Sequence, residues 1–489
     1  MNQPLLDLDA ETMRHLGYQV VDHLAARIAG LDDEPAWQGA SRAELEARLR
    51  HPAPETAATF KALLDRLIHD VLPYTARVDH PRFFGFVPGS ATWPGVLADF
   101  LAAGHNVFQG TWLASSGPSE IELVVLDWFR TWLGMPAEAG GLFTSGGSVA
   151  TLTAIAAARR LRLGGHDPRA IVYRSAECHS SVERALLLLG FGDSQVRVVA
   201  CDDRQRIRPD ALAAAMDADT AAGRLPFLVI ANAGATSTGA IDPIPELSRL
   251  CRDRGVWFHI DAAYGGFVIL TERGRSWLAG IGEADSITLD PHKWLYQPFE
   301  AGCLMVRDAR ALAAAFHLSP DYLRDAAVAD NGPDAPSEVN FTDRGVQLTR
   351  SARALKIWLS IHYFGLDAFR RAIDRCLDLA VLAEDRIRGS ATLELVTPAT
   401  LGIVSFRRRV GEPDAPDAEG RSEAVNAALV RGLARSGLGM ISSTRVSGRY
   451  VLRICILNHR TRQEDVERVL DWLETTPVDQ AAHVLASSR

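Results

Sequence analysis

The sequence lacks the features that mark membrane proteins, secreted scaffolds and nucleic-acid binders. Its six cysteines include no C-x-x-C pair, so we expect reduced thiols in the cytoplasm, without a disulfide framework or a metal site. It contains no apolar run of about 18 residues, and the polar start Met1–Pro4 precedes no signal-peptide pattern, so we expect neither membrane spanning nor secretion. A net charge of −8 gives no reason to expect a nucleic-acid or anionic-membrane partner.

The chain does have enough length and apolar content for more than one folded unit. Its 489 residues exceed a single-core domain, and 47% hydrophobic with 23% charged residues is ordinary for a soluble globular protein. Changes in pattern along the chain predict three units: a helical arm over residues 1–80, a large domain over 81–360 and a small domain over 361–489. No internal repeat is evident.

Apolar spacing predicts the order of elements. Helical spacing covers 11–29, 42–50, 59–71 and parts of 95–132. Strands alternate with helices in the centre of the chain, as in an α/β fold, with strands at 170–173 and 227–231. The last unit has an α+β pattern, with strands near 393–396, 402–407, 439–443 and 450–457 and helices near 422–435 and 463–474. The polar, Gly- and Pro-containing stretch 317–340 predicts a long loop.

Two short apolar runs within 257–305 end in ionisable side chains. The first ends at Asp261, and the second is followed by Asp290, His292 and Lys293. Such runs are typical of buried parallel strands, whose carboxyl ends open into the ligand crevice of an α/β sheet. We therefore expect an acid and an amine side by side at one edge of the sheet.

This pairing favours pyridoxal 5'-phosphate (PLP) chemistry. A lysine such as Lys293 in a partly desolvated crevice can act as a Schiff-base nucleophile. The aldehyde of PLP needs a lysine, and its ring nitrogen needs a carboxylate such as Asp261. An ordinary ion pair at a strand edge is the alternative for either residue taken alone.

The surrounding sequence is similar to a known family. The stretch H-I-D-A-A-Y-G-G (259–266), followed by D-P-H-K-W (290–294), resembles the signature of the PLP-dependent group II amino-acid decarboxylases, which include enzymes for aromatic amino acids, histidine and glutamate. The resemblance implies PLP fold type I: an aspartate-aminotransferase-like large domain with a mostly parallel sheet, a helical N-terminal arm and a small α+β C-terminal domain. It also implies a homodimer in which the arm wraps the partner subunit.

A glycine-rich turn predicts where the phosphate of PLP would bind. Gly146 and Gly147 precede Ser148, which opens a helix, and a helix N-terminus offers free amides and a positive dipole end. Gly-Ser before a helix is also a common cap. With the strand-end acid and lysine downstream, we expect a phosphate cup formed by Gly147, Ser148 and the amide of Val149.

The resemblance implies further site residues. The histidine of C-H-S-S-V-E-R (178–184) matches one that stacks on the cofactor ring, and Thr236 matches a threonine near its 3-hydroxyl group. His292 could contact the substrate carboxylate or the phosphate, or serve only as a structural partner of nearby backbone. The expected cofactor-binding residues are Gly147, Ser148, Val149, His179, Thr236, Asp261, Ala263, Asp290, His292 and Lys293. The expected catalytic residues are Lys293, His179, Asp261, His292 and Phe341.

The aromatic stretch 81–94 matches the family segment that lines the substrate side-chain pocket. The matching positions are Phe86, Val87 and Pro88, and Trp112 is a further aromatic residue expected near the cofactor. Such a segment could also be packing filler. An aromatic L-amino acid is the expected substrate, although Gly110 stands where aromatic-acid enzymes carry a large side chain.

Phe341 is a departure from the family pattern. We align it with the lid tyrosine that delivers a proton to the reacting carbon, and phenylalanine has no proton to give. In plant members, phenylalanine there accompanies aldehyde synthases. Decarboxylation to an amine and CO2 is the first hypothesis, and decarboxylation with oxidative deamination to an aldehyde is the second. Phe341 could also be only a packing residue. An aminotransferase or lyase on the same fold, or a catalytically silent binding protein, are the remaining alternatives.

Overall fold

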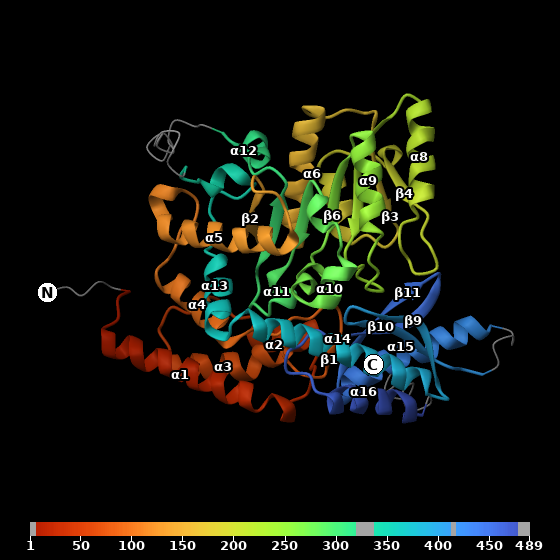
Figure 1. Ribbon diagram of the computed structural model, residues 1–489. Coiled ribbons are helices and arrows are strands. Elements are labelled where there is room, and N and C mark those ends of the chain that lie inside the picture. The colour runs from red at the N-terminus through yellow and green to blue at the C-terminus, as the bar shows by residue number, and fades with distance from the viewer. Residues whose placement is uncertain (1–5, 319–336, 412–416, 478–489) are drawn as a thin grey trace.

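The computed structural model describes residues 6–318, 337–411 and 417–477. Two sheets organise the chain, a seven-stranded one in the large domain and a five-stranded one in the small domain. Figure 1 shows the large domain above the small domain, with the N-terminal helices along the lower edge. No helix in the described ranges combines the length and the apolar character needed to cross a membrane.

The large sheet has the strand order β2-β8-β7-β6-β5-β3-β4. Its strands are β2 (Gly140–Thr144), β3 (Ala170–Ser175), β4 (Val196–Val199), β5 (Leu225–Asn232), β6 (Trp257–Asp261), β7 (Ser286–Leu289) and β8 (Gly302–Val306). Strands β4, β3, β5, β6 and β7 run parallel, and β8 is antiparallel to both β7 and β2. The mostly parallel sheet expected from the alternating pattern is confirmed.

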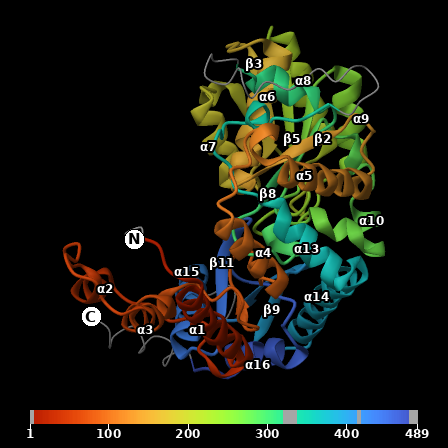
Figure 2. The same ribbon diagram turned by 90° about the vertical axis from the view of Figure 1, so that its left-hand side faces the viewer.

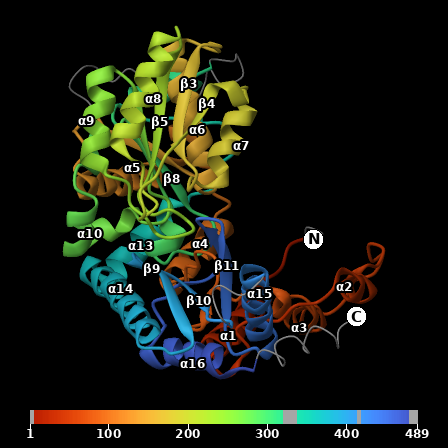
Figure 3. The same ribbon diagram turned by 90° about the vertical axis from the view of Figure 1, so that its right-hand side faces the viewer.

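Helices cover both faces of this sheet, which explains why its strands are continuous apolar runs. Helices α6 (Gly147–Leu163) and α7 (Ser180–Leu188) pack together on one face, and α8 (Pro209–Ala221) and α9 (Ile244–Arg254) pack on the other (Figure 3). Strand β6 is buried over its whole length. The apolar side chains of this strand are buried under the helices, and its acidic residue, Asp261, lies where the strand ends; His259, within the strand, bonds to Ser286 of β7.

The register brings three strand ends into line. Asn232 at the end of β5 pairs with Asp261 at the end of β6, which pairs with Thr288 in β7. The carboxyl ends of these parallel strands therefore form one edge of the sheet, and the segments that follow them converge there.

The small domain contains an antiparallel sheet of β9 (Leu393–Thr400), β10 (Ile403–Arg408), β11 (Met440–Val446) and β12 (Arg449–Cys455). Helices α14 (Leu366–Arg388), α15 (Ala418–Ser436) and α16 (Gln463–Thr475) pack on it. The strands and helices predicted for this unit are confirmed. The fifth strand, β1 (Phe83–Phe84), pairs in parallel with β11, and Phe84 belongs to the small-domain core. The segment just after the arm therefore adds a strand to the small sheet. The predicted domain boundaries, which assign residues 81–360 to the large domain, do not anticipate this.

The N-terminal arm consists of α1 (Ala10–Ala29), α2 (Arg42–Leu49) and α3 (Phe60–Asp70), and its three predicted helices are confirmed. No residue of these three helices, all of which the structure describes, is buried. Apolar side chains such as Met13 and Leu67 are about half exposed. Figure 2 shows α2 and α3 reaching out from the body of the chain.

The remaining elements connect these units. The helices are α4 (Trp93–Gly104), α5 (Trp112–Leu133), α10 (Glu272–Trp277), α11 (Pro291–Trp294), α12 (Arg310–Phe316) and α13 (Ala354–Phe364). The 3-10 helices are η1 (Leu31–Asp33), η2 (Leu72–Tyr74), η3 (Asp193–Gln195), η4 (Gly266–Leu270), η5 (Ile281–Glu283) and η7 (Phe341–Arg344). Most of the loop predicted at 317–340 lies outside the described residues.

Candidate active site

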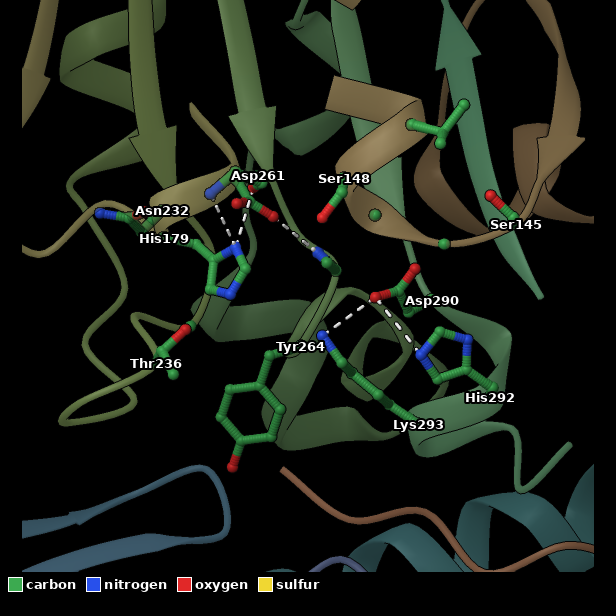
Figure 4. A pocket seen from close by; sticks show the side chains of 16 residues that line it. Ser145, Ser148, His179, Asn232, Thr236, Asp261, Tyr264, Asp290, His292 and Lys293 are labelled. Carbon is green, nitrogen blue, oxygen red and sulfur yellow. Dashed lines mark hydrogen bonds and ion pairs between the residues drawn. The ribbon is translucent and has the colours of Figure 1, made fainter. Parts of the chain in front are cut away.

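A cavity of about 270 Å³ lies at the edge of the large sheet, where β3, β5, β6 and β7 end and α6 begins (Figure 4). It is lined by all ten residues expected to bind the cofactor, although they come from five different parts of the chain. The cavity has about the size of a small cofactor site.

Asp261 occupies the floor of the cavity at the end of β6, where 8% of the residue is exposed. Its Oδ1 accepts a hydrogen bond from the amide of Ala263 at 3.1 Å. Burial raises the pKa of Asp261, and the nearby charges of Lys293 and His179 act against this rise. A carboxylate in such surroundings is suited to bind a protonated ring nitrogen, which would supply the charge that burial otherwise leaves uncompensated.

Lys293 lies on the short helix α11, which follows β7. Its Nζ is 3.0 Å from Oδ2 of Asp290, three residues earlier, and its side chain is 20% exposed. Nε2 of His292 faces the same carboxylate oxygen at 3.6 Å, and Nδ1 of His292 is 2.7 Å from the carbonyl oxygen of Ala301. Burial lowers the pKa of His292. One turn of helix therefore presents an amine, a neutral imidazole and a carboxylate to the cavity.

His179 approaches from the other side of the cavity, at the N-terminus of α7. Its Nδ1 lies 2.8 Å from the hydroxyl oxygen of Ser181 and accepts from the amide of Ser181 at 3.2 Å, which holds the ring at the start of the helix. Figure 4 shows the imidazole beside Asp261. The residue is exposed, so one face of the ring is free to stack on a planar group.

The glycine-rich turn before α6 has the geometry of an anion cup, with one difference from expectation. Gly146 has φ 155°, a conformation open to glycine, and Ser148 is exposed to the cavity. The amide of Val149 already donates to the carbonyl oxygen of Gly146 at 3.1 Å. The amides of Gly147 and Ser148, at the head of the helix, are therefore better placed for a phosphate.

The predicted substrate segment passes close to Lys293, but its named residues do not line the cavity. A Cβ on Gly89 would collide with the carbonyl oxygen of His292, so the two backbones touch. Pro88 is buried and Val87 half-buried, whereas Phe86 is 62% exposed. The backbone of Phe86 is bonded to Ser442 and Arg453 of the small domain.

Trp112 begins α5, and its amide donates to the side-chain oxygen of Asn340 at 2.8 Å. The residue is half-buried and is not part of the cavity wall within this chain.

Phe341 is the predicted site residue that the structure places elsewhere. Its side chain is fully buried, with the guanidinium groups of Arg350 and Arg344 at 4.7 and 5.4 Å from the ring centre. In this conformation the ring does not line the cavity. Its burial favours the packing role that was the alternative, and a role in place of the lid tyrosine stays a prediction.

Some cavity residues were not singled out from the sequence. Tyr264 lies in the motif H-I-D-A-A-Y-G-G, and its hydroxyl oxygen accepts from the amide of Gly402 in the small domain at 2.9 Å. Asn232 ends β5 as Asp261 ends β6, and its Nδ2 donates to the hydroxyl of Ser175 at 3.1 Å. The polar residue at the end of an apolar run was the signal that could have found Asn232.

A comparison with protein families decides the identity. Residues 43–409 match the model described as "Pyridoxal-dependent decarboxylase conserved domain".

The chain belongs to the pyridoxal-dependent decarboxylase family.

As a pyridoxal-dependent decarboxylase it is a carboxy-lyase that uses PLP to decarboxylate an amino acid, and the aminotransferase and silent-protein alternatives are set aside. It is 41% identical to an aromatic-L-amino-acid decarboxylase of Bacillus atrophaeus, over 95% of each chain. It is 30% identical to a phenylacetaldehyde synthase of Arabidopsis thaliana, again over 95% of each chain. The crystal structure of Oryza sativa TDC with PLP and tryptamine superimposes with a TM-score of 0.89 at 28% identity, covering 99% of this decarboxylase and 100% of that chain.

The residues of the cavity fit PLP. A lysine amine stands within reach of an aldehyde, a buried carboxylate is available for the ring nitrogen, an imidazole face is free for the ring, and a helix N-terminus is available for the phosphate. The PLP fold type I expected from the sequence is confirmed by the structural neighbours.

Proposed function

We propose that this decarboxylase converts an aromatic L-amino acid to the corresponding amine and CO2. The observation that carries the proposal is the convergence of Lys293, Asp261 and His179 on one cavity, in a chain 41% identical to an aromatic-L-amino-acid decarboxylase. When bound, PLP supplies an electron sink for the bond to the leaving carboxylate. The remaining steps fall to side chains of this chain.

Lys293 and Asp261 would hold opposite ends of the cofactor. The amine of Lys293 would hold the cofactor aldehyde, and the carboxylate of Asp261 would hold the protonated ring nitrogen through a charge-assisted hydrogen bond. His179 and Thr236 would orient the ring before the substrate arrives.

His292 is positioned to act on the substrate carboxylate. Its Nδ1 contact with the carbonyl oxygen of Ala301 orients the ring, and burial keeps the imidazole neutral, as its lowered pKa indicates. A neutral ring does not hold a departing carboxylate as an ion pair, which favours release of uncharged CO2. A purely structural role for His292, through Ala301, is the alternative.

We propose a cytoplasmic homodimer. The three arm helices bury none of their residues in this chain, and a second copy would cover their exposed apolar side chains, including Met13 and Leu67. Phe86, Val87, Pro88 and Trp112 would then complete the substrate pocket at the interface. All six cysteines are free thiols, which suits a reducing compartment. Light scattering on the purified protein would give twice the chain mass, and a monomer would contradict the proposal.

The direct test is incubation of the PLP-loaded protein with a panel of L-amino acids, measuring CO2, amine, ammonia and hydrogen peroxide together. Amine and CO2 in equal amounts from an aromatic substrate, without peroxide, is the expected result. Lys293→Ala is the matched control and should form neither product. Turnover of acidic or aliphatic amino acids with none of aromatic ones would contradict the substrate class.

Aldehyde formation is the second candidate, because a phenylacetaldehyde synthase is 30% identical over 95% of the chain. The buried position of Phe341 does not support it. Two substitutions test the point. Phe341→Tyr should leave the ratio of amine to aldehyde unchanged. Tyr322 is the one tyrosine in the sequence between His317 and Phe341, in a segment outside the described residues. If the donor of the proton is a phenol of this segment, Tyr322→Phe will shift the products towards aldehyde.

A further inference from the structure

The carboxylate of Asp290 lies where the phosphate of PLP is expected. Asp290 is 3% exposed and lines the cavity. A Cβ on Gly147 would lie 3.0 Å from its Oδ2 and 3.4 Å from its Oδ1, so the carboxylate rests against the first residue of α6. Within the described residues, Oδ1 has no hydrogen-bond partner. A buried carboxylate beside the cup, with one oxygen unpartnered and the other bonded only to Lys293, calls for an explanation.

Two negative groups in this space would repel each other strongly. The phosphate carries up to two negative charges, and the buried cavity screens charges poorly. In the free protein Lys293 compensates Asp290 at 3.0 Å. Bonding to the cofactor aldehyde, with loss of water, would commit this nitrogen to the cofactor as the phosphate arrives, and its pairing with Asp290 would weaken. Both changes act against a charged carboxylate.

The neighbouring imidazole does not replace the lost cation. Nδ1 of His292 lies 2.7 Å from the carbonyl oxygen of Ala301, which can only accept, and 3.3 Å from the amide nitrogen of the same residue. We assign the proton to Nδ1 because the shorter contact requires a donor there. Nε2 of the neutral ring then directs a lone pair at Oδ2 of Asp290, 3.6 Å away. The lowered pKa of His292 agrees with a neutral ring.

The other charged groups around Asp290 do not compensate it either. Asp261 adds a second negative charge across the cavity, and His179 lies beside Asp261. Behind the cavity, Lys356 is bonded to Asp99 and Arg350 is bonded to Glu122. Burial raises the pKa of the nearby thiol of Cys303, which keeps it neutral.

We propose that Asp290 takes up one proton when PLP binds and shares it with the phosphate through a short O–H···O hydrogen bond. This proposal rests on the α6 phosphate site of the proposed function. The proton comes from solvent, the carboxylate becomes a carboxylic acid, and no other bond forms or breaks in this step. Linkage then requires that the affinity for PLP falls as the pH rises, by about tenfold per unit where one proton is taken up.

The experiment measures PLP binding to the full-length protein by calorimetry in two buffers of different ionisation enthalpy, which gives the number of protons taken up. Asp290→Asn is an isosteric variant that supplies an N–H donor without charge. We expect the wild-type protein to take up one proton more than Asp290→Asn, because the other proton changes on binding are common to both, with at least about tenfold tighter PLP binding by the variant above neutral pH. Pyridoxal lacks the phosphate, so the substitution should not raise the affinity of the protein for pyridoxal to a comparable extent.

Glu177→Gln is the matched control. Glu177 is another partly buried carboxylate with one unpartnered oxygen, just after β3, but it does not line the cavity. Its substitution removes the same charge from the same domain. PLP affinity and proton uptake should match those of the wild-type protein.

The outcomes separate this inference from the proposed function. Equal proton uptake by the wild-type protein and Asp290→Asn, or weaker PLP binding by this variant with pyridoxal unaffected, overturns the inference. Equal proton uptake by the wild-type protein on binding PLP and on binding pyridoxal overturns it without any variant, so the test does not depend on the variant folding. A wild-type protein that binds no PLP and acquires no visible absorbance contradicts the proposed function itself.

Discussion

Two clusters of buried charge lie close together in the large domain and differ in how their charges are matched. In the first, Glu122 and Arg350 have side chains 0% and 1% exposed. Oε1 of Glu122 accepts from Arg350 at 2.7 Å and from the amide of Phe143 at 2.9 Å, and Oε2 accepts from Gln109 at 2.7 Å. In the second, the active-site cavity, Asp290 leaves one oxygen unpartnered and Asp261 accepts one backbone bond.

The difference distinguishes buried charges that stabilise the fold from buried charges that can bind a ligand. A buried carboxylate with every oxygen bonded stabilises the contacts around it and has no capacity for a ligand. A buried carboxylate with unfilled capacity that lines a cavity can accept a bond from a group that arrives later. Phe341 packs against Arg350 of the first cluster, which favours a structural role for its ring.

The largest expected effect is in the cavity. Lys293→Ala removes the amine that bonds the cofactor and should lower kcat by at least about a thousandfold. Because the change also leaves the buried carboxylate of Asp290 without its cation, the unfolding temperature should fall as well. CO2 release and thermal unfolding measured on the same preparation check both parts. A variant that retained activity would show that the cavity is not the active site.

The next effect is in the structural cluster. Glu122→Gln leaves Arg350 buried without its carboxylate and should lower the free energy of unfolding by about 3–5 kcal/mol. Urea unfolding measures it. The double variant Glu122→Gln with Arg350→Met is the control and should lose less than the sum of the two single variants. An additive result would show that the two charges do not stabilise each other.

A third test exchanges a carboxylate for an amide in the cavity. Asp261→Asn keeps the shape but loses the charge that binds the ring nitrogen, so kcat should fall by about 10²–10³-fold. Stability should not fall, because burial already disfavours the charged form of Asp261, as its raised pKa indicates. Initial rates and urea unfolding provide the measurements. A loss of stability like that of Glu122→Gln would remove the distinction between the two clusters.

Acid should weaken the sheet beneath the cavity through His259. Its side chain lies between Ser286 and Thr288 in the sheet, and burial lowers its pKa from 6.5 to about 4. The folded state therefore excludes a proton that the unfolded chain accepts. Above pH 6.5 this group does not reduce the free energy of unfolding. As the pH falls from 6.5 towards 4, the free energy of unfolding decreases, and the loss reaches about 3 kcal/mol below pH 4. Unfolding of His259→Gln across this range should show a shallower slope than the wild-type protein.

The smallest effect is expected where the cavity meets the small domain. Tyr264→Phe leaves the buried amide of Gly402 without its acceptor and should cost about 1–2 kcal/mol of unfolding free energy. Catalytic rates should change less than in Asp261→Asn. Urea unfolding and steady-state kinetics give the comparison, with Tyr363→Phe, at an exposed tyrosine, as the control. An equal loss in both variants would indicate that the bond to Gly402 contributes nothing.

Much of the architecture could be predicted because it is encoded locally. Period-2 and period-3.6 apolar patterns predicted the arm helices, the central strands and the small-domain elements to within a few residues. Asp261 and Lys293 were predicted to lie together because polar side chains directly after buried parallel strands converge at one edge of the sheet. The turn at Gly147 was predicted from the helix that it opens. His179 and Thr236 were implied by the resemblance to the family and not by topology.

The failures concern contacts between residues far apart in the chain. The alignment of Phe341 rested on distance along the chain from a helix, and the packing of Arg344 and Arg350 around it could not be seen there. The pairing of β1 with β11 joins residues more than 350 positions apart, and two residues carry too little pattern to predict a strand.

The sequence by itself determined the fold, the family and the identity of the groups in the cavity, because these follow from local periodicity and from residue types that the chemistry requires. Only the tertiary structure decided which buried charges are already matched and which retain capacity for a ligand. Hydrogen-bond capacity is filled or left open by partners from distant segments, and the geometry of those partners is a property of the folded chain.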